Sequence, residues 1–305
     1  MEIRQPLVTP EWISDRLASG PGTAPTRLAI GPGTANTHLV HVGVDRKGYD
    51  AAHIPGAIFV DMHVDLAKTG TRPETGAAKR MYLVPTREET EAALRAWGVA
   101  PGHDVVLYDD AGQMRWAARG YWLLRLYGFP PERVHVLDGG LAAWQADGRP
   151  VTNTETVAAP VETTEPLHER DESLIATAEQ VLEWSREAAA PGGPTRLLDV
   201  RLPDEFLGTD VRARRGGRIP GARQRVFSDF VAPNGRLRAA AETLALLEGT
   251  GVHADEVRAT YCQGGIRAAL AWFVLHEVAG LDQVRNYAGS WEEWGNRPEL
   301  PVENQ

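Results

Sequence analysis

The chain has 305 residues, more than one ordinary domain of roughly 150 residues and enough for two. Hydrophobic residues make up 43% and charged residues 24%, and no run approaches the ~20 apolar residues that cross a bilayer, so we predict a globular protein outside the membrane. The net charge of -9 argues against nucleic acid as a partner, because phosphate binding needs a basic stripe. The N-terminal residues lack the apolar segment of a secretion signal, which predicts a cytoplasmic location.

The first half alternates short apolar strands with helices. Thr9 is a good N-cap for a first helix. The apolar runs LVHVGV (39–44), VVLY (105–108) and VHVL (134–137) predict strands, and ARGYWLLRLYG (118–128) predicts a helix between the last two. Strands that alternate with helices favour a parallel sheet covered on both faces.

The second half repeats this alternation after a polar segment. Residues 152–173 are rich in Thr, Glu and Pro and are predicted to be a linker. Thr177 is a second N-cap, LLDV (197–200) and ATYC (259–262) predict strands, and IRAALAWFVLHEVAG (266–280) predicts a buried helix.

Two motifs occur once in each half and indicate a duplication. HIPGA at residues 53–57 recurs as RIPGA at 218–222. DGGLAAW at 138–144 corresponds to YAGSWEEW at 287–294, and an Arg-Pro pair follows each within a few residues. We therefore predict two tandem α/β domains, each a small parallel sheet flanked by helices.

The predicted domains span residues 1–151 and 174–305. Counting from the Ile-Pro-Gly-Ala motifs places Asp109 of the first copy where Cys262 lies in the second, provided that the first copy has an extra segment around residues 66–85. Cys262 is the only cysteine, which excludes an internal disulfide, a metal site of cysteines alone and an internal resolving thiol. Covalent chemistry at Cys262 must therefore be completed by an external partner.

A glycine-containing loop carries this cysteine from a strand into a helix. Its glycines let backbone N–H groups turn inward, and the helix behind adds unpaired amides and the positive end of its dipole, so the loop is an anion cradle. Although a lone cysteine is more often a small buried hydrophobe, the amides, the dipole and the arginine of this loop favour the thiolate, which predicts a nucleophile. The loop consists of Cys262, Gln263, Gly264, Gly265, Ile266 and Arg267.

The repeat, the two motifs in both halves and the cysteine loop together resemble the rhodanese family of sulfurtransferases in its tandem two-domain form, over nearly the whole chain. The resemblance implies that Cys262 is the catalytic residue, that the other five loop residues bind substrate, and that the site lies in a cleft between the domains. It also implies that the first domain is inactive, because Asp109 cannot accept sulfane sulfur.

The implied reaction is ping-pong sulfur transfer through a Cys262 persulfide, without metal or cofactor. The donor is a small anion, with thiosulfate favoured over 3-mercaptopyruvate, and the acceptor is cyanide, a small thiol or a protein thiol. Arg267 is expected to hold the anionic end of the donor, to close the loop through backbone carbonyls, or both. Arg215, in a basic segment that resembles the donor-binding segment of the mercaptopyruvate branch, is a further predicted substrate-binding residue, with a solvated basic loop as the alternative.

Two other functions stay open at this point. Related cysteine-dependent phosphatases carry Cys-x5-Arg, whereas four residues separate Cys262 from Arg267 here, which makes a tighter ring suited to sulfur and cramped for phosphate. A non-enzymatic sulfur-carrier or interaction module is the second alternative. An intact cysteine loop beside an inactive copy argues against a role in binding alone.

Overall fold

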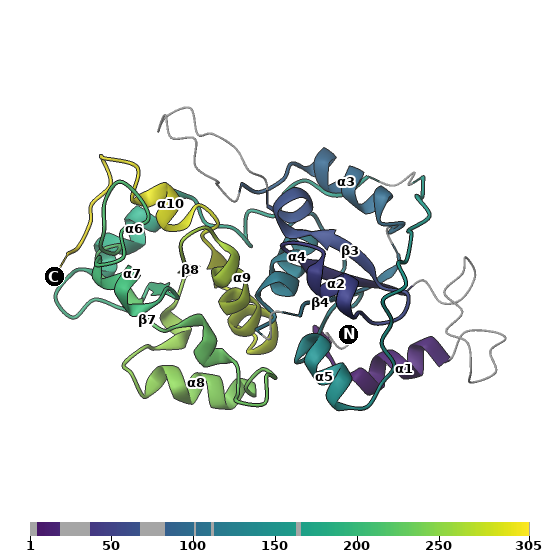
Figure 1. Ribbon diagram of the computed structural model, residues 1–305. Helices are drawn as coiled ribbons and strands as arrows, with labels where there is room; N and C mark the ends of the chain where they lie inside the picture. The colour runs from purple at the N-terminus through teal and green to yellow at the C-terminus, as the bar shows by residue number, and fades with distance from the viewer. Residues whose placement is uncertain are drawn as a thin grey trace. The chain divides into compact units, whose positions relative to one another are not determined.

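The computed structural model describes residues 5–18, 37–67, 83–100, 102–110, 113–162 and 166–304. The chain divides into two compact units, each of them α/β, as Figure 1 shows. The first comprises residues up to Leu66, Pro85–Arg170 and Pro233–Arg236, and the second mainly Asp171–Ala232 and Leu237–Gln305. Most of the extra segment predicted around residues 66–85 lies outside the described residues. Among those described, no helix has the length and apolar character needed to cross a bilayer.

The first unit is built on a five-stranded parallel sheet with the order β1-β5-β4-β2-β3, which confirms the predicted parallel sheet. Its central strands are buried along almost their whole length, as expected for a sheet with helices on both faces. The strands are β1 (Leu7–Val8), β2 (Thr37–Gly43), β3 (Ile58–Asp61), β4 (Asp104–Tyr108) and β5 (Val134–Leu137). The helices are α1 (Pro10–Ala18), α2 (Lys47–Ala51), the π-helix η1 (Met62–Leu66), α3 (Arg87–Ala96), α4 (Arg115–Leu126) and α5 (Gly140–Ala146).

The second unit repeats this topology with a four-stranded parallel sheet in the order β7-β6-β8-β9. The residue Ile175 adds a parallel bridge to Asn286 of β9, where β1 pairs with β5 in the first unit. The strands are β6 (Leu197–Asp199), β7 (Arg223–Gln224), β8 (Ala259–Tyr261) and β9 (Arg285–Asn286). The helices are α6 (Ala178–Ala188), α7 (Pro203–Leu207), η2 (Phe227–Phe230), α8 (Ala240–Glu248), η3 (Ala254–Glu256), α9 (Ile266–Trp272), the π-helix η4 (Phe273–Val278) and α10 (Ser290–Trp294).

The Ile-Pro-Gly-Ala motif makes the same contact in both units. The backbone N–H of Ile54 donates to the hydroxyl of Tyr108 at 3.1 Å, and that of Ile219 donates to the hydroxyl of Tyr261 at 3.2 Å. Both tyrosines end the central strand of their sheet and are fully buried. In both units the motif thus ties its turn to the central strand of the sheet.

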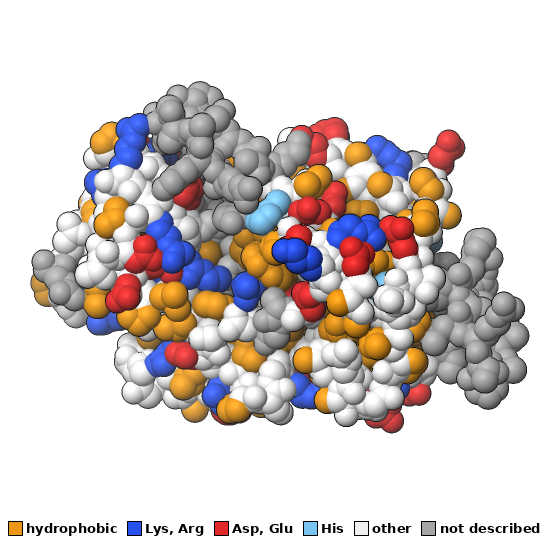
Figure 2. All heavy atoms as spheres, viewed as in Figure 1, with side chains coloured by type: hydrophobic (Ala, Val, Ile, Leu, Met, Phe, Trp, Pro, Cys, Tyr) orange, Lys and Arg blue, Asp and Glu red, His pale blue; other side chains and the backbone are white. Residues whose placement is uncertain are grey.

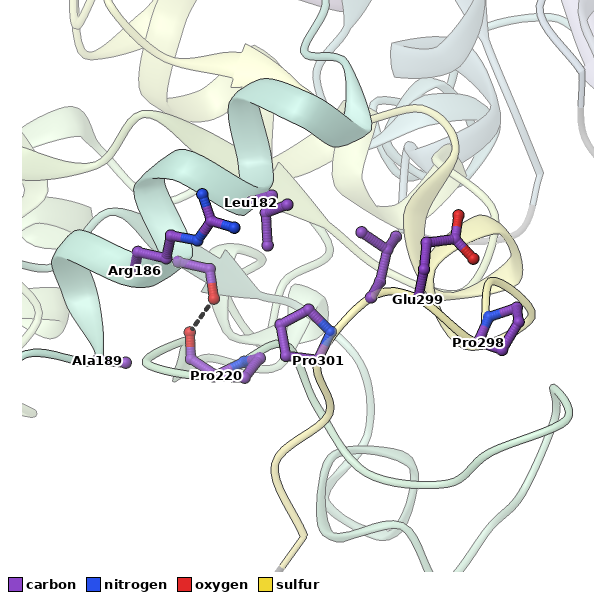
Figure 3. Close-up of a pocket in the computed structure, with 9 residues that line it drawn as sticks. Leu182, Arg186, Ala189, Pro220, Pro298, Glu299 and Pro301 are labelled. Carbon is purple, nitrogen blue, oxygen red and sulfur yellow. Dashed lines mark hydrogen bonds between the residues drawn. The ribbon is translucent and has the colours of Figure 1, made fainter.

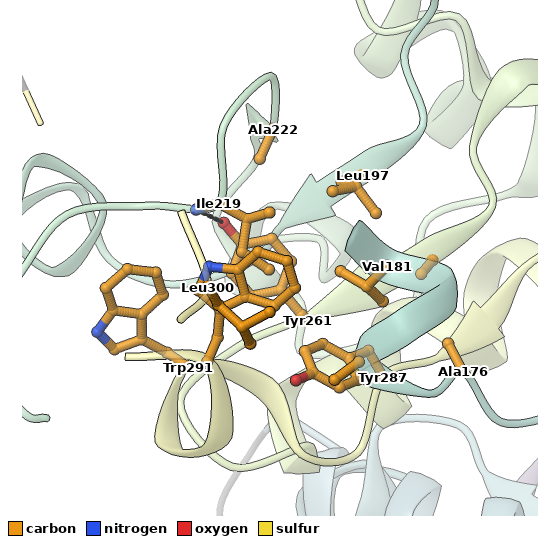
Figure 4. Packing of buried hydrophobic residues seen from close by; sticks show 12 residues of the cluster. Ala176, Val181, Leu197, Ile219, Ala222, Tyr261, Tyr287, Trp291 and Leu300 are labelled. Carbon is orange, nitrogen blue, oxygen red and sulfur yellow. Dashed lines mark hydrogen bonds between the residues drawn. The ribbon is translucent and has the colours of Figure 1, made fainter. Parts of the chain in front are cut away.

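The closing tryptophan also has a counterpart in each unit. The indole N–H of Trp144 donates to the carbonyl of Pro150, and that of Trp294 donates to the carbonyl of Pro301, both at 2.7 Å. Figure 4 shows the core of the second unit around Tyr261 and Trp291. This core consists of Ala176, Ala178, Val181, Leu197, Ile219, Ala222, Ala259, Tyr261, Tyr287, Trp291, Trp294 and Leu300.

The helix starts predicted from threonine are confirmed. Thr177 forms a capping box with Gln180 at the start of α6, and the Thr9 hydroxyl accepts a hydrogen bond from the N–H of Trp12. Residues 152–173, predicted as a linker, make contacts of their own with the first unit. The N–H of Thr152 donates to the carbonyl of His53, and the N–H of Val161 to that of Arg95. This segment thus follows the first unit as far as Arg170.

The surface carries both signs of charge. On the face drawn in Figure 2, arginine and lysine side chains are interspersed with aspartate and glutamate side chains. Several form exposed ion pairs, such as Arg46 with Glu155 at 2.9 Å. Pairs of this kind contribute about 0–1 kcal/mol each to stability. Each unit is therefore stabilised mainly by its own hydrophobic core rather than by its surface charges.

Two carboxyl groups lie close together where β3 ends. Asp65 accepts a hydrogen bond from the N–H of Asp61 at 3.1 Å, and burial, together with the charge of Asp61, raises the pKa of Asp65 to about 6 despite that hydrogen bond. A folded-state pKa above the unfolded one means that stability falls as the pH rises from about 4 to about 6. We expect Asp65→Asn to raise the unfolding free energy by about 1–2 kcal/mol at neutral pH and to have little effect below about pH 4. Urea unfolding of both proteins across this range tests it, and an equal effect at all pH values would contradict it.

Candidate active site

Cys262 lies directly after β8, at the carboxyl end of the central strand of the second sheet. Ligands of open α/β sheets bind at this edge. The side chain is 1% exposed, and its Sγ atom accepts a hydrogen bond from the backbone N–H of Gly265 at 3.2 Å. An amide N–H that points at a sulfur atom can stabilise negative charge on it.

The start of α10 holds the cysteine loop from one side. The N–H of Cys262 donates to the hydroxyl of Ser290 at 3.1 Å, and the carbonyl of Cys262 accepts from the N–H of Trp291 at 2.9 Å. The carbonyl of Gln263 accepts from the N–H of Glu292 at 2.8 Å. The motif YAGSWEEW at residues 287–294 thus also anchors the cysteine loop.

Gly265 needs to be a glycine for two reasons. Its φ of 79° lies in the left-handed region, and a Cβ atom there would lie 2.6 Å from the carbonyl oxygen of Ala288. Its carbonyl accepts a hydrogen bond from the Asn286 side chain at 3.2 Å. Gly264 and Ile266 on either side are buried. These contacts fix the Gly265 amide that donates to the sulfur.

The side chain of Gln263 is turned toward neighbouring protein groups. Its amide nitrogen donates to the Glu292 carboxylate at 2.9 Å and to the Arg212 carbonyl at 3.3 Å. Its oxygen is buried and has no hydrogen-bond partner within the described part of the chain. The contacts of this side chain are thus with the protein itself.

Arg267 forms a two-pronged ion pair with Glu205 of α7, at 2.6 and 2.8 Å. Burial alone raises the pKa of the Glu205 carboxyl, but the hydrogen bonds and charge of Arg267 outweigh burial and hold that pKa below its usual range. The Leu202 N–H and Arg212 add to this effect. Burial likewise lowers the pKa of Arg267, yet Glu205 and the charge of Cys262 raise it above its usual value.

This pair differs from the expected closure through backbone carbonyls, and donor binding by Arg267 stays a prediction. The guanidinium closes the loop onto a carboxylate rather than onto backbone carbonyls, and two of its nitrogens are occupied there. Glu205 and Arg267 are 62 positions apart in the chain, so no spacing in the sequence could reveal the pair. If Arg267 binds the donor, it does so while its guanidinium is paired with the Glu205 carboxylate.

Arg215 has a different surrounding from the one expected of a donor-binding residue. Its guanidinium donates to the carbonyls of Leu300 at 2.7 Å, Trp294 at 2.9 Å and Gly295 at 3.3 Å, and also to that of Arg297. These contacts fasten the segment 294–300. Arg215 therefore holds the backbone of residues 294–300 in place. The structure gives no support to its predicted role in substrate binding.

The first unit has a matching loop that holds a carboxylate. The N–H of Leu141 donates to the Asp109 carbonyl at 3.1 Å, as Trp291 does to Cys262. The Asp109 side chain is buried and accepts from the N–H groups of Trp116 and Ala117 at 3.0 and 3.3 Å, at the start of α4. Burial raises the pKa of Asp109 although these two hydrogen bonds lower it. Two amides at the start of α4 are thus taken by the chain's own carboxyl group.

A separate pocket of about 560 Å³ lies elsewhere in the second unit. Figure 3 shows it lined by Leu182 and Arg186 of α6 and by Pro298 and Pro301 near the C-terminus. Neither Cys262 nor any other residue of its loop lines it. This pocket is therefore not part of the cysteine loop.

Two like α/β units, one with a lone cysteine on a strand-to-helix loop and one with an aspartate at the matching place, define a tandem protein with a single thiol site. The rhodanese-like domain model matches residues 33–147 and 177–297. The chain belongs to the rhodanese-like family.

Relatives and solved structures agree with this membership. The chain is 35% identical over 306 residues to a thiosulfate sulfurtransferase of Corynebacterium glutamicum, covering 97% of this chain and 90% of the relative. It is 36% identical over 255 residues to that of Azotobacter vinelandii, covering 84% and 87%. The anaerobic ergothioneine biosynthesis enzyme of Chlorobium limicola shares the fold, with a TM-score of 0.78 at 24% identity, covering 98% of this chain and 70% of that one.

Proposed function

We propose that this protein is a thiosulfate sulfurtransferase that moves sulfane sulfur to cyanide or a thiol through a persulfide on Cys262. The observation that carries the proposal is the sulfur of the only cysteine, at the end of β8, accepting the Gly265 N–H at 3.2 Å. The names of the relatives in Corynebacterium glutamicum and Azotobacter vinelandii support thiosulfate as the donor.

The first step is attack of the Cys262 thiolate on the outer sulfur of thiosulfate. The new S–S bond forms as the old one breaks, and sulfite leaves with the electron pair of the broken bond. The terminal sulfur of the persulfide then carries the negative charge, which amide N–H groups of the loop stabilise. In the second step cyanide or a thiolate attacks that terminal sulfur, and thiocyanate or a new persulfide leaves while the Cys262 thiolate is restored.

The charges around the loop set a condition on donor binding. Because Arg267 and Glu205 neutralise each other, their pair as a whole adds little net positive charge for a dianion. The backbone amides of residues 263–267 are then the main stabilising groups, and Gln263, Gly264, Gly265 and Ile266 are proposed to act chiefly through their backbone. A cytoplasmic location and a protein thiol as the acceptor in the cell stay predictions from the sequence.

Parallel assays of the purified protein with thiosulfate and with 3-mercaptopyruvate, each with cyanide, test the donor. We expect kcat/KM to be at least about tenfold higher with thiosulfate, a difference of about 1.4 kcal/mol in transition-state stabilisation. Release of sulfite without acceptor should stop at one per Cys262, as a ping-pong mechanism requires. A higher kcat/KM with 3-mercaptopyruvate would show that thiosulfate is not the preferred donor. Hydrolysis of a phosphate ester without release of thiocyanate would favour the alternative function, a cysteine-dependent phosphatase.

A further inference from the structure

Ser290 has a backbone conformation that suits glycine. Its φ is 51°, and Met114 is the other non-glycine residue with a positive φ among those described. Side chains with a Cβ atom adopt this left-handed region at an energetic cost. The corresponding residue of the first unit is Gly140 with a φ of 57°, since the residue after it contacts Asp109 as Trp291 contacts Cys262. The strained backbone of Ser290 therefore suggests that its hydroxyl group has a specific role.

The hydroxyl of Ser290 makes two buried hydrogen bonds. It donates to the carbonyl of Tyr287 at 2.8 Å and accepts from the N–H of Cys262 at 3.1 Å. Because its proton points to Tyr287, a lone pair of the oxygen is directed at Cys262. Ser290, Tyr287 and Cys262 are each at most 1% exposed, so water does not readily replace this contact.

We propose that Ser290 is a positioning residue that holds the Cys262 backbone so that the sulfur stays against the Gly265 N–H. The inference rests on the proposed function, in which this sulfur is the nucleophile. Without the hydroxyl, the buried N–H of Cys262 loses its hydrogen-bond acceptor. Because an unpaired buried N–H is costly, the start of the loop shifts so that this N–H meets another acceptor. The sulfur then moves away from the Gly265 amide, and the thiolate and the persulfide lose that stabilisation. The aspartate loop of the first unit carries no such sulfur, and glycine occupies the place there.

Two substitutions separate the effect of the hydroxyl group from the effect of the left-handed backbone conformation. Ser290→Gly removes the oxygen and also the strain of a Cβ atom in this conformation, whereas Ser290→Ala removes the oxygen and keeps that strain. We expect the two variants to differ in melting temperature, with the glycine variant the more stable. We expect both to lose about tenfold in kcat, with KM for thiosulfate within about twofold of wild type.

Alkylation of Cys262 by iodoacetamide across a range of pH gives a second readout that needs no sulfur donor. Both variants should react more slowly than wild type at neutral pH, because the thiolate is less stabilised. A folded Ser290→Gly variant with wild-type kcat and alkylation rate would overturn the inference, as would an effect confined to KM. If the wild-type protein transfers no sulfur, the proposed function fails, and the alkylation rates alone decide the role of Ser290.

Discussion

Cys262→Ser lowers the kcat/KM of sulfur transfer by at least about 10³-fold, because a serine hydroxyl at neutral pH is neither ionised nor able to form a persulfide. No other residue can take over, since the chain has no second cysteine. The substitution is close in size, and the serine oxygen can still accept the Gly265 N–H. The melting temperature should therefore change by no more than a few degrees, so the loss of activity reports chemistry rather than unfolding.

Intact mass measured after incubation with thiosulfate, without acceptor, checks the covalent step directly. The wild-type protein should gain the mass of one sulfur atom and lose it again when cyanide is added. Cys262→Ser should gain nothing. Gln263→Ala serves as the control, because it alters the adjacent side chain and keeps the thiol, and it should still form the persulfide. Transfer at the wild-type rate by the serine variant would refute the persulfide mechanism.

Glu205→Gln has the largest expected effect on stability, a loss of about 3–5 kcal/mol in the free energy of unfolding. The side chain of Glu205 is 1% exposed and that of Arg267 is 14% exposed, so the substitution leaves a largely buried guanidinium without its countercharge. Urea unfolding measures the loss. Asp204→Asn is a matched control on the same helix, because Asp204 is exposed, and it should stay within about 0.5 kcal/mol of wild type.

The pH dependence of this loss tests its electrostatic origin. Since Arg267 holds the pKa of Glu205 below its usual range, the pair stabilises the fold above the ordinary glutamate pKa, and the contribution disappears as the pH falls through the lowered value. The difference between wild type and Glu205→Gln should therefore shrink in acid. Replacing both partners, with Glu205→Leu and Arg267→Met, should recover much of the stability. A loss that is the same at every pH would contradict the ion pair as its cause.

Much of the fold could be predicted from local patterns. VVLY and VHVL lie within strands β4 and β5, and the first three residues of ATYC form β8, as apolar runs of this kind predict. Thr9 and Thr177 mark helix starts through their own hydroxyl groups. The duplication was visible because both copies contain the residues that tie the turn before β3 or β7 to the central tyrosine. The path of residues 152–170 was not, because its backbone hydrogen bonds to His53 and Arg95 leave no mark in its composition.

The sequence by itself determined that a lone cysteine follows a strand in the second of two related α/β units, since these features depend on neighbouring residues and on a repeat. Only the tertiary structure decided which groups surround that cysteine. Ser290 contacts Cys262 from 28 positions along the chain, and Glu205 contacts Arg267 of the same loop from 62 positions away. Arg215 turns instead to the backbone of residues 294–300. The physical reason is that hydrogen bonds and ion pairs act over a few ångströms in space, irrespective of distance along the chain, so chain folding alone brings such partners together.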